Sequence, residues 1–283
     1  MILIADSGST KTDWILITPK QPHTAFKTAG INPFFLSDKE MFRVISKQEN
    51  LIALAEHVKE VYFFGAGCSS PDKREAVSNV LSQVFKQAYI SVDSDLLGSA
   101  YATCGTESGL CCILGTGSNI TYFDGENIFE GKHGLGYVLG DEGSGSYFGK
   151  KLVTDYLYGR MPETESALFA NNYSVNKETL INHVYHKQGA NYYLASFAAF
   201  LSEIKVGDYG KKLIQEGLTE FVTTNIKSYQ EYKTIKCHFV GSVAWHLKEE
   251  LQEICTSQEI QIGKIIKHPI QDLVSFLLTR VKI

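Results

Sequence analysis

Two short turns in the sequence combine glycine with hydroxyl side chains. Residues 5 to 14 read ADSGSTKTDW between two apolar runs, and GTGSN at 115 to 119 also lies between apolar runs, CCIL and ITYF. Glycine permits positive φ and lets backbone N–H groups point into a concavity, where hydroxyl and ammonium groups add donors for phosphate. The candidate phosphate-binding residues are Gly8, Ser9, Thr10, Lys11, Gly115, Thr116, Gly117 and Ser118. A plain turn between strands is the alternative for either stretch alone, and two matched turns favour binding.

Asp6 lies immediately before the first of these turns. Its negative charge would repel a bound phosphate, unless a Mg²⁺ ion lies between them. We therefore predict that Asp6 holds Mg²⁺, through water, beside a polyphosphate.

Asp95 lies in VDSDLLGSAYAT, residues 92 to 103, between an expected strand at 89–92 and a helical run. As a helix N-cap it would stabilise the helix by about 1 kcal/mol. As a general base toward a substrate hydroxyl it would contribute roughly 10²- to 10⁴-fold in rate. The two interpretations differ in their consequences, because an Asn at this position still caps a helix but cannot act as a base.

The densest glycine region is GKHGLGYVLGDEGSGSYFGK, residues 131 to 150, where seven glycines surround the acid pair Asp141 and Glu142. This composition predicts an irregular loop whose backbone approaches a polar ligand and whose carboxylates accept its hydroxyl groups. A flexible surface loop is the alternative. The apolar residues Tyr137, Val138 and Leu139 favour a packed loop.

The elements that must position these residues follow an α/β pattern. Strands are expected around the first turn, within residues 1–18, and at 61–64, with helical stretches at 38–60 and 73–87. The second strand, turn and strand at 111–123 repeats the first and suggests an internal duplication, each half giving one turn to a shared cleft. Further on, apolar stripes such as Leu194, Phe197, Leu201 and Ile204 predict core helices, 237–240 a strand, and 269–283 a closing helix with Pro269 in its first turn.

Composition excludes several classes of function. The 283 residues favour two domains, and a net charge of −4 with a pI near 6.1 gives no basic field for nucleic acid or an anionic membrane. Six cysteines without a C-x-x-C pair, and no leader or membrane span, favour a cytoplasmic protein with free thiols. The P-loop, the dinucleotide fingerprint, the protein-kinase motifs and the G-x-S-x-G elbow are all absent, and no histidine pairs with cysteines at zinc spacing.

In this order, the motifs resemble those of the N-acetylglucosamine kinase family, within the actin-like and hexokinase-like ATPase superfamily. The resemblance rests on DSGSTKTDW, DLLGSA, LGTGSN, GLGYVLGDEGSG and FVGSVAW, and with the stretch GDYGKKLIQEG it spans nearly the whole chain. It implies an α/β protein of two ribonuclease-H-like domains that close over a sugar and MgATP. The expected domains are 1–105 plus 270–283, and 106–269 with helical insertions.

The resemblance also implies roles for individual residues. Thr10 and Thr116 would contact the ATP phosphates, Gly241 and Ser242 the nucleoside, and Asp95 would activate the acceptor hydroxyl. The residues expected to line the sugar pocket are Asn32, Ser118, Asn119, Gly134, Leu135, Gly136, Asp141 and Gly145. For Asn32, an ordinary Asn-Pro turn is the alternative.

The implied reaction is ATP-dependent phosphorylation of an amino sugar, foremost N-acetylglucosamine at its 6-hydroxyl. Leu135 replaces an aromatic residue common in related enzymes, which leaves glucosamine and N-acetylmuramic acid as alternatives. An activator of 2-hydroxyacyl-CoA dehydratases is disfavoured, because residues 120–150 contain no cysteine for an iron–sulfur cluster. A non-catalytic sugar sensor ranks last because Asp6 and Asp95 are both present. A homodimer is common in this group, and the sequence does not decide it.

Overall fold

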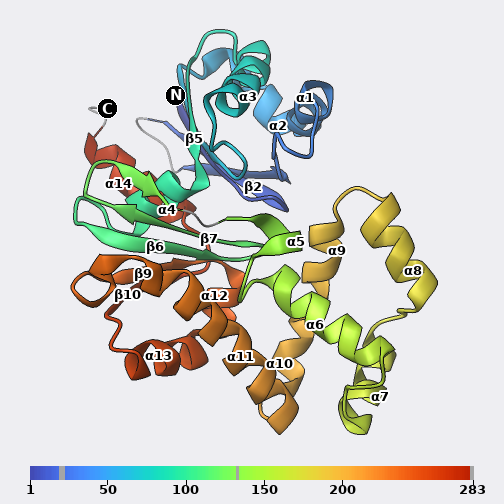
Figure 1. Cartoon of the computed structure of the whole chain (residues 1–283). Coiled ribbons are helices and arrows are strands. Elements are labelled where there is room, and N and C mark those ends of the chain that lie inside the picture. Colours follow the sequence, from blue (N-terminus) through green and yellow to red (C-terminus); the bar gives the residue numbers. More distant parts are fainter. Residues whose placement is uncertain (19–22, 132–133, 281–283) are drawn as a thin grey trace. The chain divides into compact units, whose positions relative to one another are not determined.

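The computed structural model describes residues 1–18, 23–131 and 134–280, and the chain divides into two compact units. Unit 1 comprises residues 1–107, 125–128 and 268–283, and unit 2 comprises residues 108–124 and 129–267. Each unit is built around a five-stranded sheet (Figure 1). The α/β class that the sequence predicts is therefore confirmed.

The sheet of unit 1 has the strand order β3-β2-β1-β4-β5. Its strands are β1 (Ile2–Ser7), β2 (Lys11–Ile17), β3 (Thr24–Ala29), β4 (Glu60–Gly65) and β5 (Tyr89–Ser94). β1 pairs with β2, and β2 with β3, in antiparallel fashion, whereas β1, β4 and β5 are parallel. Leu3, Ile4 and Ala5 are consecutive and buried, which is typical of a strand covered on both faces.

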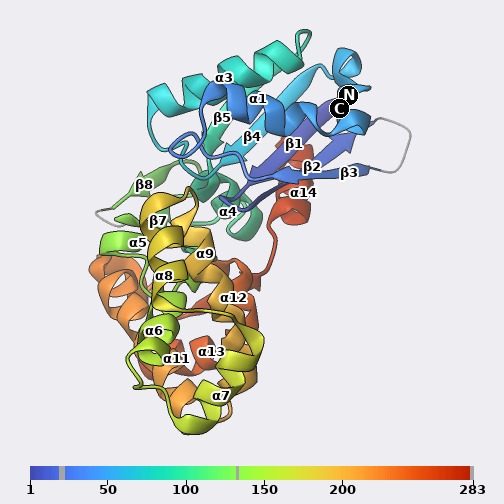
Figure 2. The same cartoon turned by 90° about the vertical axis from the view of Figure 1, so that its right-hand side faces the viewer.

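Helices cover both faces of this sheet. They are α1 (Asp38–Ser46), α2 (Glu49–Ile52), the 3₁₀ turn Ala55–His57, α3 (Pro71–Val84), α4 (Asp95–Thr103) and α14 (Ile270–Arg280). Figure 2 shows α1 and α3 over one face and α4 and α14, side by side, against the other. The helical stretch predicted at 38–60 is divided into three short pieces, and the closing helix begins at Ile270, after Pro269.

The sheet of unit 2 repeats this plan. Its strands are β6 (Gly109–Leu114), β7 (Ser118–Phe123), β8 (Ile128–Glu130), β9 (Cys237–Val240) and β10 (Ile262–Ile266), in the order β10-β9-β6-β7-β8. β6 and β7 are antiparallel, and β6, β9 and β10 are parallel. Taken in chain order, the five strands have the same neighbours as in unit 1. This shared order and hairpin is what an internal duplication predicts.

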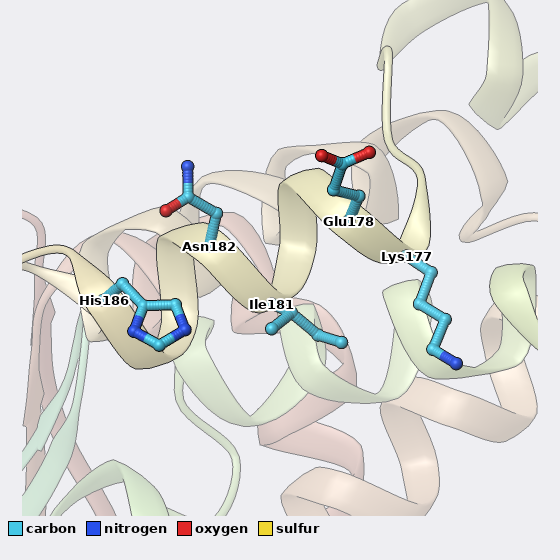
Figure 3. Close-up of a pocket in the computed structure, with 5 residues that line it drawn as sticks. All are labelled: Lys177, Glu178, Ile181, Asn182 and His186. Carbon is cyan, nitrogen blue, oxygen red and sulfur yellow. The ribbon is translucent and has the colours of Figure 1, made fainter.

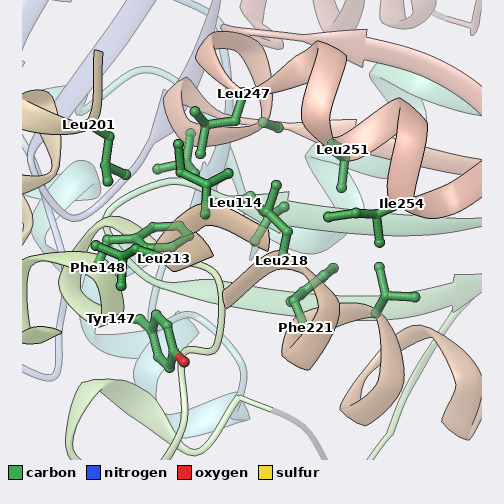
Figure 4. Packing of buried hydrophobic residues seen from close by; sticks show 14 of the residues in the cluster. Leu114, Tyr147, Phe148, Leu201, Leu213, Leu218, Phe221, Leu247, Leu251 and Ile254 are labelled. Carbon is green, nitrogen blue, oxygen red and sulfur yellow. The ribbon is translucent and has the colours of Figure 1, made fainter. Parts of the chain in front are cut away.

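Most of the remaining chain is helical. Unit 2 contains α5 (Gly136–Leu139), α6 (Gly145–Leu157), α7 (Glu163–Asn172), α8 (Lys177–Ile181), α9 (Ala190–Ser196), α10 (Leu201–Ile204), α11 (Asp208–Thr224), α12 (Ser242–His246) and α13 (Lys248–Ser257). Short 3₁₀ and π turns occupy 182–186, 197–200, 226–228 and 230–233. The largest buried side chains of this unit, among them Phe148 and Phe221, join these helices to the sheet (Figure 4). The predicted stripe Leu194, Phe197, Leu201 and Ile204 is buried in this core.

Candidate functional site

The carboxyl ends of β1, β4 and β5 lie at one edge of the sheet of unit 1. Ser7 is level with Gly65, and Gly65 is level with Ser94. Asp6 therefore lies one residue before this edge, in β1, and Asp95 one residue after it, at the start of the helix that follows β5, and only β4 separates β1 from β5. Because ligands of α/β sheets bind at the carboxyl ends of strands, this edge is where a site is expected.

The two carboxylates interact electrostatically. The pKa of Asp6 is raised from 3.8 to about 7, first by burial, then by the negative charges of Asp95 and Asp13, against the opposing charge of Lys11. A carboxyl group that loses hydration beside a like charge favours its neutral form. The pair therefore has excess negative potential, which a cation would relieve.

Asp95 is the first residue of α4, and the N-cap of this helix is Ser94. The Ser94 hydroxyl accepts a hydrogen bond from the backbone N–H of Leu97 at 3.4 Å. The interpretation of Asp95 as an N-cap is therefore wrong, since strand β5 continues two residues beyond its predicted end and places the preceding serine in that position. The Asp95 carboxylate also affects Cys68, a fully buried thiol whose pKa is raised to about 12 mainly by burial.

The segment that follows β3, residues 30–32, holds the first polar turn in place through hydrogen bonds. Asn32 is buried, its side-chain amide donates to Ser9 Oγ at 3.1 Å, and its side-chain oxygen accepts from the backbone N–H of Phe34 at 2.9 Å. Gly30 donates its N–H to the carbonyl of Thr10, and a Cβ at Gly30 would lie 2.4 Å from the Ser9 carbonyl oxygen. Asn32 thus connects the first turn to the body of unit 1.

A second link to this segment was not anticipated from the sequence. Ser7 Oγ lies 2.7 Å from Thr12 Oγ1, accepts from the N–H of Ile31 at 3.0 Å and donates to the Ile31 carbonyl at 3.2 Å. Both hydroxyl groups are fully buried. Their signal in the sequence is that they are small hydroxyl residues on either side of the turn, Ser7 at the end of β1 and Thr12 near the start of β2.

Lys11 begins β2, and its ammonium group points along the strand. Its Nζ lies 2.6 Å from Asp13 Oδ2 and 3.2 Å from His268 Nδ1. Asp13 is buried, and its other oxygen lies 3.9 Å from Lys27 Nζ. The predicted role of Lys11 as a phosphate ligand would therefore compete with an ion pair already made.

In unit 2, the second polar turn is supported by the start of α6. The N–H of Gly145 donates to the Gly115 carbonyl at 2.8 Å, and that of Ser146 to the Thr116 carbonyl at 2.9 Å. These bonds hold the carbonyls of the turn toward the helix. Gly145 also packs within 3.2 Å of Ala195, measured from the position of a Cβ, so the structure gives it a close-packing role.

The glycines of the two turns differ from expectation in one respect. The residues with positive φ do not include Gly8, Gly115 or Gly117. A Cβ at Gly115 would meet nothing within 4 Å, whereas one at Gly117 would lie 2.7 Å from Asp141 Oδ2. The expectation of positive φ was wrong. The absence of a side chain matters instead: it leaves open volume beside Gly115 and makes room for the Asp141 carboxylate at Gly117.

Asp141 is held against the second turn in a strained conformation. Its φ is 59°, in the left-handed region that non-glycine residues seldom occupy. Its carboxylate accepts from the N–H of Ser118 and lies 3.5 Å from Ser146 Oγ, while burial raises its pKa. Its neighbour Glu142 instead accepts from the buried amide of Asn225 at 3.3 Å. Of the two acids, only Asp141 therefore has its carboxylate bonded to the second polar turn, while Glu142 is bonded to Asn225.

The backbone of the glycine-rich segment packs against the side chain of Asn119 at Gly134. A Cβ at Gly134 would lie 3.0 Å from both polar atoms of the Asn119 side chain, and Gly134 has a φ of 79°. Gly136 also has positive φ, of 77°, with open space around it. Residues 132 and 133, the Lys and His of the segment, lie outside the described residues.

The side chains of α5 contradict one expectation. Tyr137 packs against the core of unit 2, but Leu135, Val138 and Leu139 are 64%, 69% and 77% exposed. The prediction that Val138 and Leu139 indicate a packed loop is therefore wrong. Four residues form little more than one helical turn, so only one of them is directed inward.

The turn after β9 closes on the second polar turn. Gly241 has a φ of 125°, and a Cβ there would lie 2.3 Å from the Leu114 carbonyl oxygen and 3.1 Å from the Gly115 nitrogen. Only glycine fits this contact without strain. Ser242 is exposed at the start of α12.

The predicted site residues therefore form two groups, one in each unit. Unit 1 brings together Asp6, Gly8, Ser9, Thr10, Asn32 and Asp95, and unit 2 brings together Gly115, Thr116, Gly117, Ser118, Asn119, Gly134, Asp141, Gly145 and Gly241. Lys11 is directed to an ion pair, Leu135 and Ser242 are exposed, and Gly136 has open space around it.

Other features of the described residues carry no comparable chemistry. No group of three or more His, Cys, Asp or Glu side chains within them could hold a metal ion, and none of their helices is long and apolar enough to cross a membrane. All six cysteines are free and buried. A surface hollow on α8 and the π turn after it is lined by five residues of one helical stretch, none of them a predicted site residue (Figure 3).

Solved structures place the fold. The candidate N-acetylglucosamine kinase of Porphyromonas gingivalis is 35% identical over 98% of both chains, with a TM-score of 0.91. A candidate N-acetylglucosamine kinase of Chromobacterium violaceum is 17% identical over 98% of both chains, with a TM-score of 0.74. A ROK-family glucokinase of Streptomyces griseus, solved with glucose and AMPPNP, is 14% identical over 97% of both chains, with a TM-score of 0.58.

No protein-family model and no curated protein matches the sequence. The two distant structures support the fold alone. The Porphyromonas protein is similar over nearly the whole chain, which includes both polar turns and both sheets. The chain therefore belongs to the N-acetylglucosamine kinase family of ATP-dependent sugar kinases, within the actin-like and hexokinase-like superfamily.

Proposed function

We propose that the protein transfers the γ-phosphoryl group of ATP to the 6-hydroxyl of N-acetylglucosamine. The observation that carries this proposal is that Asp6 and Asp95 lie at one edge of a sheet and interact electrostatically. Catalysis of this kind needs a base to receive the hydroxyl proton and a cation to neutralise phosphate charge. One carboxylate for each task is present.

Asp95 is the general base of the proposed reaction. It accepts the proton of the acceptor hydroxyl as the oxygen attacks the γ-phosphorus. Its position as the first residue of α4 supports this role, since the cap of the helix is supplied by Ser94 and the Asp95 carboxylate is not needed for that purpose.

Asp6 fits a hydrated Mg²⁺ ion. Its carboxyl is poorly hydrated and faces the like charge of Asp95, a combination that a divalent cation would stabilise in its ionised form. Mg²⁺ commonly binds through one or two carboxylates, keeping several waters and taking its other ligands from phosphate. The ion would supply charge neutralisation on the phosphates.

The nucleotide phosphates are assigned to the two polar turns, with the hydroxyls of Ser9, Thr10 and Thr116 as donors. The open volume beside Gly115 supports this assignment, since a side chain there would occupy the space that a phosphate needs. Gly241 and Ser242, which close on the same turn, are assigned to the nucleoside.

The sugar is assigned to the residues around Asp141. This carboxylate, with Ser118, Asn119 and the backbone of Gly134 and Gly136, offers acceptors and donors of the kind that bind sugar hydroxyls. The strained backbone of Asp141 supports a functional role, since such conformations cluster at sites. N-acetylglucosamine is chosen over glucosamine and N-acetylmuramic acid because the 35% identical Porphyromonas structure bears that name.

A sugar panel tests the proposal. Purified protein with MgATP would be scored for ADP release with N-acetylglucosamine, glucosamine, N-acetylmuramic acid and no sugar. We expect release only with sugar, fastest with N-acetylglucosamine, and none with its 6-deoxy analogue. A product phosphorylated at another carbon, or equal turnover without sugar, would contradict the proposal.

A further inference from the structure

Helix α12 presents a large aromatic side chain to solvent close to the second polar turn. Trp245 is 41% exposed, although the two residues before it, Val243 and Ala244, are buried and anchor the helix. Tryptophan is usually mostly buried, and an exposed one offers a flat surface for a partner. The other tryptophan of the chain, Trp14, is fully buried in unit 1.

The position of Trp245 relative to the turn is fixed by backbone contacts. The backbone N–H of Trp245 donates to the Gly241 carbonyl at 3.0 Å, and Gly241 in turn packs on Leu114 and Gly115. One helical turn, about 5.4 Å of rise, therefore separates the backbone of Trp245 from that of Gly241, the residue that packs on the turn assigned to phosphate. Ser242 and Trp245, three residues apart, lie on the same exposed face of the helix.

One basic side chain lies over the indole and another lies beside the next residue of the helix. Lys248 Nζ lies 5.3 Å from the Trp245 ring centroid, and Lys267 Nζ lies 3.1 Å from His246 Nε2. The nearby acid Glu250 is directed to Lys205, with a separation of 3.6 Å. An aromatic plane beside basic groups suits a ligand that joins a flat ring to a polyanion.

We propose that Trp245 is the stacking surface for the purine base of ATP, and hence a residue that determines nucleotide affinity. This inference rests on the function proposed above, because it takes the Gly115 turn as a phosphate site. The base lies on the indole, the ribose passes Ser242 and Gly241, and the phosphates reach the turn. Trp245 contributes binding of the nucleotide and has no part in the chemistry at Asp95.

Tryptophan fluorescence tests the contact directly, since Trp245 and the buried Trp14 are the only emitters of this type. We expect ADP to quench the wild-type signal and to leave that of Trp245→Phe unchanged. Inorganic tripolyphosphate, which has no base, should bind without quenching. Equal quenching in both proteins, or by tripolyphosphate, would overturn the inference.

Steady-state kinetics supply a second measurement. Base stacking on an aromatic ring is worth about 1–3 kcal/mol, so we expect Trp245→Ala to raise the KM for ATP roughly 5- to 150-fold, with kcat and the KM for sugar nearly unchanged. Trp245→Phe keeps an aromatic face and should recover most of the affinity. An unchanged KM for ATP in Trp245→Ala would overturn the inference.

Tyr158 provides a matched control. It is also an exposed aromatic of unit 2 with a cation above its ring, Arg160, at 5.2 Å. Tyr158→Ala should leave the KM for ATP unchanged, and an equal rise in both alanine variants would contradict the inference. Failure of the proposed function would give a different result. A wild-type protein that turns over no sugar and binds no ADP by calorimetry would contradict both the proposed function and this inference. An active enzyme whose KM for ATP does not change in Trp245→Ala would contradict this inference alone.

Discussion

The carboxyl groups of Asp6 and Asp95 act on one another at the carboxyl ends of the parallel strands of unit 1, and the charge of Asp95 helps to raise the pKa of Asp6 to about 7. A single strand, β4, separates β1, which carries Asp6, from β5, which leads into Asp95. The pair is costly for the folded protein when both groups are ionised, so its presence indicates a task that requires two carboxylates. Four predictions follow from this pair and from the turns near the ends of β6 and β9.

Replacement of Asp95 by Asn should abolish catalysis and preserve the fold. We expect sugar-dependent ADP release to fall roughly 10²- to 10⁴-fold because the base is lost, while the melting temperature changes little because Ser94 remains the cap. Asp38 is the first residue of α1, as Asp95 is of α4, and it is exposed. Asp38→Asn therefore serves as the control, and it should retain full activity. Retained activity in Asp95→Asn would rule out its role as base.

The pH dependence of stability should reveal the burial of Asp6. Its folded-state pKa, about 7, lies above the unfolded value of 3.8, so protonation favours the folded protein. The free energy of unfolding should therefore fall as pH rises from about 4 to about 7. Asp6→Asn removes this dependence and should be more stable than wild type above pH 7, by roughly 1 to 4 kcal/mol. Chemical denaturation at a series of pH values, without Mg²⁺, measures both curves. Identical curves would show that Asp6 is well hydrated.

Two alanine substitutions in the second turn should separate sugar binding from nucleotide binding. Gly117→Ala places a methyl group 2.7 Å from Asp141 Oδ2 and should displace that carboxylate, raising the KM for sugar roughly 10- to 100-fold. Gly115→Ala meets no protein atom within 4 Å but fills the volume assigned to phosphate. It should raise the KM for ATP and leave that for sugar nearly unchanged. The same kinetic change in both variants would disprove the division of roles.

Gly241→Ala should destabilise unit 2 and weaken nucleotide binding. The substitution combines an unfavourable φ of 125° with a contact of 2.3 Å to the Leu114 carbonyl oxygen. We expect a loss well above the 1–2 kcal/mol typical of a left-handed residue alone. Gly105, with a φ of 65° and open space around it, is a comparison site where positive φ occurs without a close contact. If Gly105→Ala and Gly241→Ala cost the same in urea denaturation, the close contact has no energetic weight.

Much of the fold could be predicted from residue patterns. The apolar runs before and after each polar turn predicted four strands that the structure contains, and the spaced apolar residues of 194–204 predicted buried helical faces. These patterns are reliable because burial of a whole face outweighs local preference. The same reasoning found the likeness between the two hairpins, which the shared strand order extends to the entire sheets.

The errors concern features that depend on distant contacts. Val138 and Leu139 are apolar yet exposed, because a helix of four residues can bury only one side. Gly117 leaves room for the carboxylate of Asp141, which is 24 residues away in the sequence. The residues next to Gly117 indicate only that glycine gives the backbone conformational freedom. The cap of α4 was misplaced by one residue because strand ends are the least certain part of a sequence pattern.

Helix α14, at residues 270–280, packs on α4, the helix that begins with the proposed base. Unit 1 therefore lacks part of one helical layer until this segment has left the ribosome. Translation of residues 108–267, which contain the whole of unit 2, takes on the order of 10 s at typical rates. During this interval, one apolar side of α4 is exposed to solvent or to a chaperone. The first half of the protein to be synthesised is thus the last to be completed.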